Sequence, residues 1–365
     1  MKRLKLKIWL ALPVLFILAC GPLSLATPTL APAIATDTPE AAPTVQGPTD
    51  APAATTAPEQ PVITVDNANN LKETGSLNFD APFRLIWSPD SSTLAVMSNH
   101  HLALYDVHAK TQSGDWAFNE PDILLDYSAA LHSVALTADQ ASLTLRDISG
   151  AAAERSIRPD APFSSAAFSP DGKSLLTTSV DEIAVTLWDT SNGEVRAKMS
   201  GFETAAPVYS AEFSADGKTL IWKARGTVQL MNLPGGELSP VFSHEDFVSA
   251  LALSPDGNIL ATSAGGTLDG NFVPLIYLWD AHNGAQKGQL KPADISSAVS
   301  FSPGGHLLAA GVGNQLTLWN VDSQQLIASL PGHSDRLSAV AFSPDGKMLA
   351  TCAADNSVRL WVIKP

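Results

Sequence analysis

Cysteine and basic residues are scarce in this chain. Its 365 residues include 2 Cys, and 22 Lys and Arg stand against 36 Asp and Glu. Cys20 and Cys352 lie on opposite sides of a Pro-rich stretch, so we expect no disulfide between them and no framework of bridges. The formal net charge of −14 argues against nucleic acid as a partner, because a phosphate backbone is bound by clustered Lys and Arg.

The sequence also lacks the motifs of common active sites. It holds no His-Glu-x-x-His, no paired Cys-x-x-Cys, no Gly-x-Ser-x-Gly and no glycine loop for phosphate. His100 and His101 are adjacent, and neighbours on a strand point to opposite faces, so they are poor candidates for one metal site. We therefore expect no catalytic residue, no metal and no cofactor, and a hydrolase or lyase is the least favoured function.

What the chain does contain is a repeated unit, which is clearest over residues 340–361. A short apolar run at residues 340–342 meets Ser-Pro-Asp-Gly at 343–346, where Pro presets one turn dihedral and Gly tolerates a left-handed one. Residues 348–351 form a second apolar run, and residues 357–361 alternate with the period of a strand. Each unit therefore predicts three strands in a meander.

Seven copies of this unit follow one another. Successive copies are roughly 40 to 48 residues apart, which is the period of four-stranded propeller blades. The sequence therefore predicts an all-β fold, a seven-bladed β-propeller of four-stranded antiparallel blades. The third strand of the copies closes at Tyr105, Arg146, Trp188, Met231, Trp279, Trp319 and Trp361.

The last copy has too few residues after Trp361 for a fourth strand. The stretch at residues 71–77 precedes the first copy and has the length of the missing strand. We expect this stretch to pair with residues 357–361 and to close the ring, because an open propeller would expose sheet edges.

Turns of the Phe-Ser-Pro-Asp-Gly type, as at residues 342–346, recur together with strand endings of the Leu-Trp-Asp type, as at residues 187–189. Over residues 69–365 this combination resembles the WD-repeat propeller family, which implies a platform for protein interactions. A family of periplasmic propellers shares the Ser-Pro-Asp-Gly turn. It does not usually carry Leu-Trp-Asp at the third strand, which makes it the second choice.

The resemblance also implies a structural role for four residues of the last copy. His333, Thr351, Asp355 and Trp361 match the positions that WD-repeat blades link by hydrogen bonds, with the imidazole between carboxylate and hydroxyl. Two other copies keep part of this set, so we expect the remaining blades to rely on packing. The partial sets are His244, Thr262 and Trp279 in the fifth copy, and Thr178 and Trp188 in the third.

Residues 1–20 are typical of a signal peptide. A basic start precedes an apolar run over residues 8–19, which is shorter than the roughly 20 residues of a membrane-spanning helix. The run ends Ile-Leu-Ala-Cys-Gly at residues 17–21, which resembles a bacterial lipoprotein processing site and implies lipid attachment at Cys20. The protein would then be secreted and anchored to the outer side of a bacterial membrane. The alternatives are an ordinary signal peptide and an uncleaved anchor.

Residues 21–68 are rich in Pro, Ala and Thr, and no Lys or Arg occurs between Lys7 and Lys72. Such a stretch holds too little apolar surface to offset the entropy of its ordering. We therefore expect a disordered linker that lets the propeller stand off the membrane.

Two families of loops should open on one face of the propeller, namely those before each first strand and those between second and third strands. The loop at residues 264–274 is longer than its counterparts, and loops that outgrow a rigid scaffold are often binding elements. We predict an acidic rim that attracts a basic peptide or a cation. The alternative is that these acidic loops only promote solubility. The candidate rim residues are Asp80, Asp122, Asp160, Asp181, Glu182, Glu203, Glu245, Asp246, Asp269, Phe272 and Asp335.

Two functions therefore lead. The first is a membrane-tethered, extracytoplasmic scaffold, with a monomeric propeller that binds a protein or peptide. The second is a receptor for a small ligand or peptide in the central channel. A fold by itself does not name a function. Polar side chains on the innermost strands, which line the channel, would favour the receptor over the scaffold.

Overall fold

The computed structural model describes residues 60–179, 184–200, 208–233 and 235–364. Its regular structure consists of strands β1 to β29 and one short 3-10 turn, η1 (Ala68–Asn70). Within this part of the chain, no helix is long and apolar enough to cross a membrane. The expected signal peptide and the expected linker up to residue 59 lie outside the described residues.

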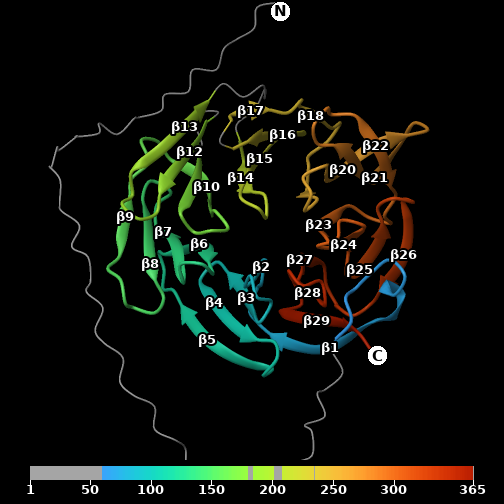
Figure 1. Cartoon of the computed structure of the whole chain (residues 1–365), viewed down its shortest axis with the longest axis horizontal. Coiled ribbons are helices and arrows are strands. Elements are labelled where there is room, and N and C mark those ends of the chain that lie inside the picture. The colour runs from blue at the N-terminus through green and yellow to red at the C-terminus, as the bar shows by residue number, and fades with distance from the viewer. Residues whose placement is uncertain (1–59, 180–183, 201–207, 234, 365) are drawn as a thin grey trace, which may run out of the picture. The chain divides into compact units, whose positions relative to one another are not determined.

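Seven antiparallel sheets form the blades of a ring (Figure 1). Each blade runs from an inner first strand to an outer fourth strand, because the chain pairs each strand with the next. The all-β, seven-bladed architecture of four-stranded antiparallel blades predicted from the repeats is confirmed.

The strands of the first three blades are three to seven residues long. The first blade holds β2 (Arg84–Trp87), β3 (Thr93–Ser98), β4 (His101–Asp106) and β5 (Thr111–Ala117). The second holds β6 (Ile123–Ser128), β7 (Ser133–Thr137), β8 (Leu143–Asp147) and β9 (Arg155–Ile157). The third holds β10 (Phe163–Phe168), β11 (Ser174–Ser179), β12 (Ala184–Asp189) and β13 (Val195–Ser200).

The other blades include one split strand and one long hairpin. The fourth holds β14 (Ser210–Phe213), β15 (Thr219–Ala224), β16 (Thr227–Asn232), β17 (Glu237–Leu238) and β18 (Phe242–Ser243). The fifth holds β19 (Ala250–Leu253), β20 (Ile259–Leu268), β21 (Asn271–Asp280) and β22 (Gln286–Leu290). The sixth holds β23 (Ser296–Phe301), β24 (Leu307–Val312), β25 (Gln315–Asn320) and β26 (Gln325–Leu330). The seventh holds β27 (Leu337–Phe342), β28 (Met348–Ala353), β29 (Ser357–Ile363) and β1 (Leu71–Asn78).

The outer strand of the fourth blade is broken in two. Both β17 and β18 pair with β16, and Pro240 lies between them. Because proline has no backbone N–H, it cannot continue a ladder of strand hydrogen bonds. The side chain of Gln229 bridges the gap by donating from Nε2 to Ser239 O at 2.9 Å.

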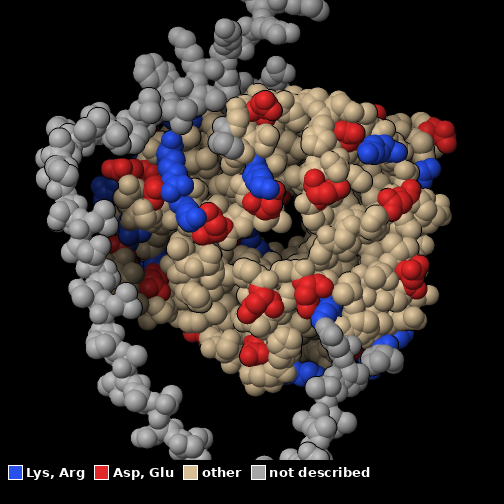
Figure 2. All heavy atoms as spheres, in the orientation of Figure 1, with Lys and Arg blue, Asp and Glu red and all other residues tan. Residues whose placement is uncertain are grey.

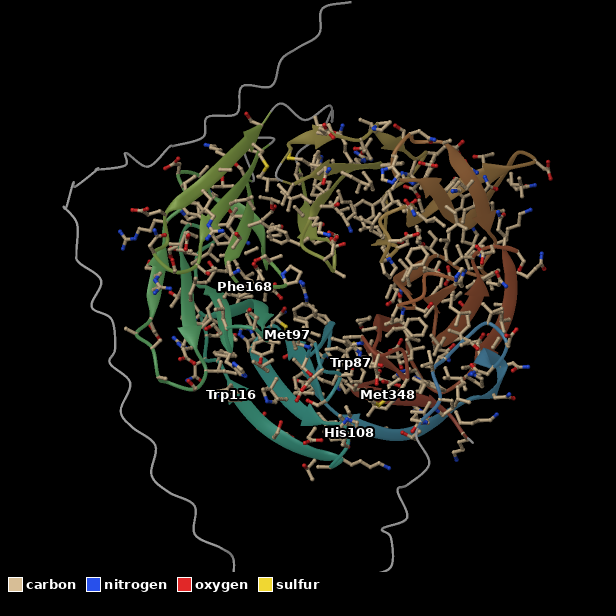
Figure 3. All side chains as sticks on the ribbon, in the orientation of Figure 1. Trp87, Met97, His108, Trp116, Phe168 and Met348 are labelled. Atoms are coloured by element: carbon tan, nitrogen blue, oxygen red, sulfur yellow. The ribbon has the colours of Figure 1, made fainter. Side chains whose placement is uncertain are left out.

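Layers of apolar side chains fill the space between neighbouring blades (Figure 3). Leu94 and Val96 of the first blade pack in one layer with Leu360 of the last blade. Trp87 lies in the same layer, and its indole N–H donates to Ala341 O at 3.1 Å. Since alternate residues of a strand face the two neighbouring layers, each blade is stabilised from both sides.

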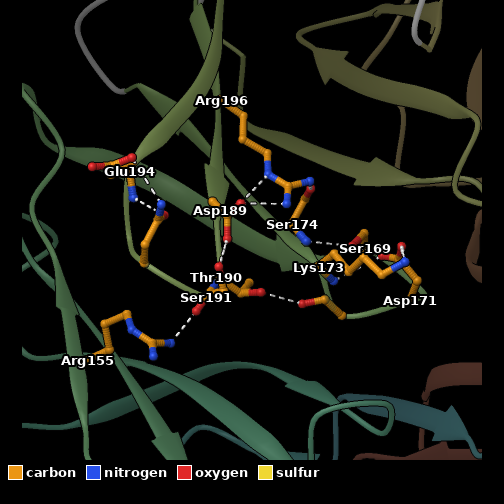
Figure 4. A network of polar contacts seen from close by, with 12 residues as sticks. Arg155, Ser169, Asp171, Lys173, Ser174, Asp189, Thr190, Ser191, Glu194 and Arg196 are labelled. Atoms are coloured by element: carbon orange, nitrogen blue, oxygen red, sulfur yellow. Dashed lines mark hydrogen bonds and ion pairs between the residues drawn. The ribbon is translucent and has the colours of Figure 1, made fainter. Parts of the chain in front are cut away.

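The turn between first and second strands follows one design in most blades. In the last blade, Ser343 Oγ donates to Asp345 Oδ1 at 2.6 Å and accepts from the N–H of Met348 at 2.9 Å. Figure 4 shows the same arrangement at Ser169 and Asp171, where the hydrogen bond from the serine hydroxyl lowers the pKa of the carboxyl. The Ser-Pro-Asp-Gly signal thus encodes a turn that fixes its own side chains.

The first and last strands close the ring. β1 pairs antiparallel with β29, from Leu71 opposite Ile363 to Asn78 opposite Ser357, and this confirms the closure predicted for residues 71–77. A bulge lies between Glu73 and Gly75. The pairing joins residues almost three hundred positions apart, so the seventh blade contains both ends of the propeller sequence.

Packed residues begin before residue 69, where the sequence suggested that the propeller starts. Ile63 is 3% exposed, and its N–H donates to Gly346 O at 2.8 Å. Gln60 Nε2 donates to Ile363 O at 3.0 Å. The packing of Ile63 could not be predicted from the sequence, because a single apolar residue in a Pro-rich stretch shows no strand or helix pattern. The chain therefore meets the ring beside the turn between β27 and β28.

Removing the closing strand should destroy the propeller. Deletion of residues 70–78 would leave the edge of β29 unpaired and expose the apolar layer that Leu71, 1% exposed, helps to fill. We expect aggregation or loss of the cooperative unfolding transition, as measured by circular dichroism on heating and by size-exclusion chromatography. A deletion of residues 40–48 is the matched control. A variant that lacks residues 70–78 yet melts like the parent would contradict this role.

Candidate functional site

Two families of loops meet at one end of the ring, as predicted. The loop before a first strand is hydrogen-bonded to the loop between second and third strands of the preceding blade. We call this end the loop face. The backbone N–H groups of Phe79, Phe118, Phe163, His244 and Leu337 make these bonds, to Asn356 O, His100 O, Gln140 O, Gly226 O and Gly313 O respectively, at 2.7 to 2.9 Å.

The loop face carries eight of the eleven candidate rim residues. The other three, Asp181, Glu182 and Glu203, lie outside the described residues. The eight are Asp80, Asp122, Asp160, Glu245, Asp246, Asp269, Phe272 and Asp335, and all but Asp122 are exposed. They are spread around the ring, although Glu245 and Asp246 share one loop and Asp269 and Phe272 share one hairpin. They therefore form a rim and not one cluster.

Most rim carboxylates have no cationic partner in the described part of the chain. Asp122 lies 3.6 Å from Arg146 Nη2, and Asp160 lies 4.0 Å from Lys198 Nζ. Within the same residues, no ion pair involves Asp80, Glu245, Asp246, Asp269 or Asp335. On the face shown in Figure 2, acidic side chains surround the central hollow and are interspersed with Lys and Arg. The loops of this face also carry Arg158, Lys291 and Arg336, and the five unpaired carboxylates outnumber these cations. The balance favours a negative potential on the loop face.

The segment at residues 264–274 is not a loop, which corrects our expectation. It extends β20 and β21 into a hairpin of two ten-residue strands whose register runs to Leu268 opposite Asn271. Asp269 and Gly270 form its two-residue turn with φ of 51° and 79°. Asp-Gly is the strongest short signal for such a hairpin, and it could have been recognised in the sequence.

Phe272 stands exposed on this hairpin. Its side chain is 62% accessible, and its ring lies across Gly265, where an added Cβ would come within 2.1 Å of the ring. The same Cβ would lie 3.1 Å from Asp246 Oδ2. The glycine therefore permits an apolar ring to lie close to a rim carboxylate.

Two further aromatic residues on the loop face were missed by sequence reasoning. Tyr209 and Phe247 are 45% and 47% exposed, and their ring centroids are 6.3 Å apart. Lys223 Nζ lies 5.5 Å from the centroid of Phe247. Each aromatic residue precedes an innermost strand, so both lie beside the mouth of the central channel.

Charged residues on the innermost strands were also missed. Asp126 is 2% exposed, lies 3.4 Å from Arg84 Nη2, and accepts from the N–H of Phe168 at 2.8 Å. Burial raises the pKa of the Asp126 carboxyl, although Arg84 and the backbone N–H groups act in the opposite direction. Three consecutive blades thus meet at one carboxylate.

The charged residues of the innermost strands could have been recognised by comparing the repeats position by position. Asp126 and Glu212 stand two positions before the turn serine of their copies. The equivalent position in the other copies is small or apolar, so the two carboxylates are departures from the pattern. The residues at that position elsewhere are Ile86, Ala167, Ala252, Ser300 and Ala341.

The four residues of the predicted tetrad are joined by hydrogen bonds. His333 Nε2 lies 2.8 Å from Thr351 Oγ1, and the indole N–H of Trp361 donates to the same oxygen at 2.9 Å. His333 Nδ1 lies 3.1 Å from Asp355 Oδ2, and Ser357 Oγ donates to Asp355 Oδ1 at 2.6 Å. Burial lowers the pKa of His333 despite the carboxylate, so the neutral imidazole is favoured and bridges its neighbours as a structural element.

The partial tetrads follow the same geometry with one correction. In the fifth blade, His244 Nε2 lies 2.7 Å from Thr262 Oγ1, and burial lowers the pKa of His244 to about 4. In the third blade, Trp188 Nε1 donates to Thr177 Oγ1 at 2.9 Å and not to Thr178 as expected. Successive side chains of a strand face opposite ways, so the residue one position earlier carries the bond.

Cys352, His100 and His101 make packing contacts or hydrogen bonds that are typical of structural residues. Cys352 is fully buried, and burial raises the pKa of its thiol to about 12, which suits the packed residue that the sequence predicted. His100 Nδ1 lies 2.8 Å from Asp122 O, while the ring of His101 stacks on Phe79 at 4.6 Å. Among the described residues, no group of three His, Cys, Asp or Glu side chains could hold a metal ion.

Two segments of the chain, residues 236–271 and 324–362, match the WD40 family, described as WD domain, G-beta repeat. The chain carries WD40 repeats. Each match starts on the outer strand of one blade and continues into the next blade, so the sequence repeat is offset from the structural blade. These are also the two repeats that contain His244 and His333. No curated protein matches the chain.

Replacing Thr351 should reveal the energetic contribution of the tetrad. Thr351→Val keeps the shape but leaves a buried indole N–H and a buried imidazole nitrogen without their shared oxygen. Unsatisfied buried polar groups cost roughly 1–3 kcal/mol each, so we expect a loss of about 2–4 kcal/mol in unfolding free energy.

Urea titration measures this loss. Thr111→Val, at an exposed position of β5, is the matched control and should change stability by less than about 0.5 kcal/mol. Equal stability of Thr351→Val and the control would show that the tetrad contributes nothing.

Proposed function

We propose that this protein is a membrane-tethered, extracytoplasmic scaffold whose loop face binds a protein or peptide with basic character. WD40 propellers are typically non-catalytic scaffolds. Their rigid ring holds loops in fixed positions, and the loops can then vary without loss of the fold. We assign no catalytic residue and no cofactor to the chain.

The observation that carries the proposal is the set of five rim carboxylates without a cationic partner. Exposed charges of one sign speed the approach of an oppositely charged partner and reject partners of the same sign. Phe272 and Phe247 add exposed apolar area on the same face. A basic segment with an apolar or aromatic anchor would match both features, because interfaces combine buried anchors with a polar rim.

The proposal includes attachment to a membrane through the N-terminal segment. It rests on the apolar leader, on Cys20 and on the Pro-rich composition of residues 21–68. One structural observation supports it. The chain joins the ring beside Gly346, in a turn between first and second strands, and antiparallel blades put these turns at the end opposite the loop face. A tether attached there would leave the loop face turned away from the membrane.

The interaction can be tested by crosslinking in intact cells that express the full chain, followed by purification and identification of bound proteins. The test variant carries Glu245→Gln, Asp246→Asn and Asp269→Asn, which remove three rim charges with little change of shape. We expect one dominant partner with the parent, and several-fold less of it with this variant or at raised salt, because exposed charges are screened.

The control variant removes three charges from the turns between third and fourth strands, with Glu154→Gln, Glu194→Gln and Asp322→Asn. It should bind like the parent. Recovery of a partner in equal amounts with both triple variants would exclude the acidic rim as the interface.

The anchor has a separate test. Cys20→Ser should abolish incorporation of a labelled fatty acid and release the protein from the membrane fraction, because a lipid chain is the proposed attachment. Unchanged labelling or membrane association of Cys20→Ser would contradict lipidation at this residue.

A further inference from the structure

The central channel contains a polar cavity that the proposed function does not use. Its volume is about 230 Å³, and the inner strands of the fourth to seventh blades line it. Ser210, Ser297 and Ser338 contribute hydroxyl groups, and Glu212 and Lys223 contribute opposite charges. The volume lies below the roughly 300–1,000 Å³ of a site for a drug-sized ligand, so it suits a smaller molecule.

The two charges in this cavity are not paired with each other. Within the described residues, neither Glu212 nor Lys223 has an oppositely charged group within 4.0 Å. They still interact at longer range. The Arg84 guanidinium and then the Lys223 ammonium act to lower the pKa of Glu212, and the Glu212 carboxylate acts to raise the pKa of Lys223. No direct salt bridge between them has to be broken before a ligand can bind.

The contrast with the neighbouring charge pair is informative. Arg84 and Asp126 face the same channel region but close directly on each other at 3.4 Å. The surrounding strands raise the pKa of Glu212 and lower the pKa of Lys223 by desolvation. Glu212 is exposed, and its side chain lines the cavity. A ligand of complementary charge would compensate both groups.

The strand register places the two charges at different depths. Lys223 of β15 lies opposite Ser210, whereas Glu212 of β14 lies two residues further along the strand, about 6–7 Å deeper. Lys223 Nζ also lies near Phe247, beside the channel mouth. A molecule that enters from the loop face would meet the ammonium first and the carboxylate second.

We propose that this cavity binds a small zwitterion of the amino-acid or dipeptide class, with its ammonium at Glu212 and its carboxylate at Lys223. The serine hydroxyls supply the remaining hydrogen bonds. A basic side chain of a partner protein would compensate Glu212 but leave Lys223 without an anion, so a zwitterion matches the lining better. A metal ion fits less well, since the described residues offer no cluster of three ligating groups.

Isothermal titration calorimetry on the full-length protein tests this assignment. The probes are the twenty free L-amino acids and the dipeptides Gly-Gly, Ala-Ala, Gly-Leu and Gly-Glu. We expect saturable binding of at least one probe. Glu212→Gln and Lys223→Gln should each weaken it about tenfold or more, because each removes one charged partner. Asp335→Asn, which removes a charge on the rim, should leave the affinity unchanged.

A chemical arm needs no variant and therefore does not depend on the folding of one. The N-acetyl and carboxamide derivatives of the bound probe each lose one charge and should fail to bind the parent protein. Binding of the carboxamide as tightly as the free acid would show a cation site and overturn the zwitterion. So would the absence of any binding probe, or an affinity that neither Glu212→Gln nor Lys223→Gln changes. The partner pull-down is read independently, since these variants leave the rim carboxylates in place.

Discussion

The pairing of β1 with β29 is the constraint on which the rest of the structure depends. A blade buries its apolar faces only against its neighbours, so the layers are complete only when the seventh blade meets the first. The hydrogen bonds from Leu71–Ile363 to Asn78–Ser357 provide that contact. Closure also sets the size of the channel, because the inner strands can approach its axis only when all seven blades occupy the ring.

The same closure explains why charges can be placed at the centre. Asp126 accepts hydrogen bonds from two backbone N–H groups and faces Arg84. Groups from three blades therefore compensate the loss of hydration of its carboxylate. Within the described residues, Glu212 and Lys223 form no salt bridge and line a cavity instead. Charged groups that line a cavity without a salt bridge are candidates for a binding role.

The repeats have diverged to different degrees, and the hydrogen bonds record this. The tetrad is complete in the last blade and partial in the fifth, which correspond to the segments that match the WD40 family. The other blades keep the serine turns and the apolar layers, which are sufficient for the ring. Loss of a histidine therefore removes a family signature without removing a blade. The acidic loops and the long hairpin of the fifth blade are additions to the blade structure that all seven copies have in common.

The sequence by itself determined the number of blades, the strand order and the closing strand, because turn chemistry and strand periodicity are local properties that recur in each copy. It also contained the Asp269-Gly270 signal for the long hairpin, which we had interpreted as a loop. Only the tertiary structure decided which side chains meet at the centre. Arg84 and Asp126 belong to different repeats, and the depth of Glu212 relative to Lys223 follows from strand register and ring closure, which no single repeat encodes.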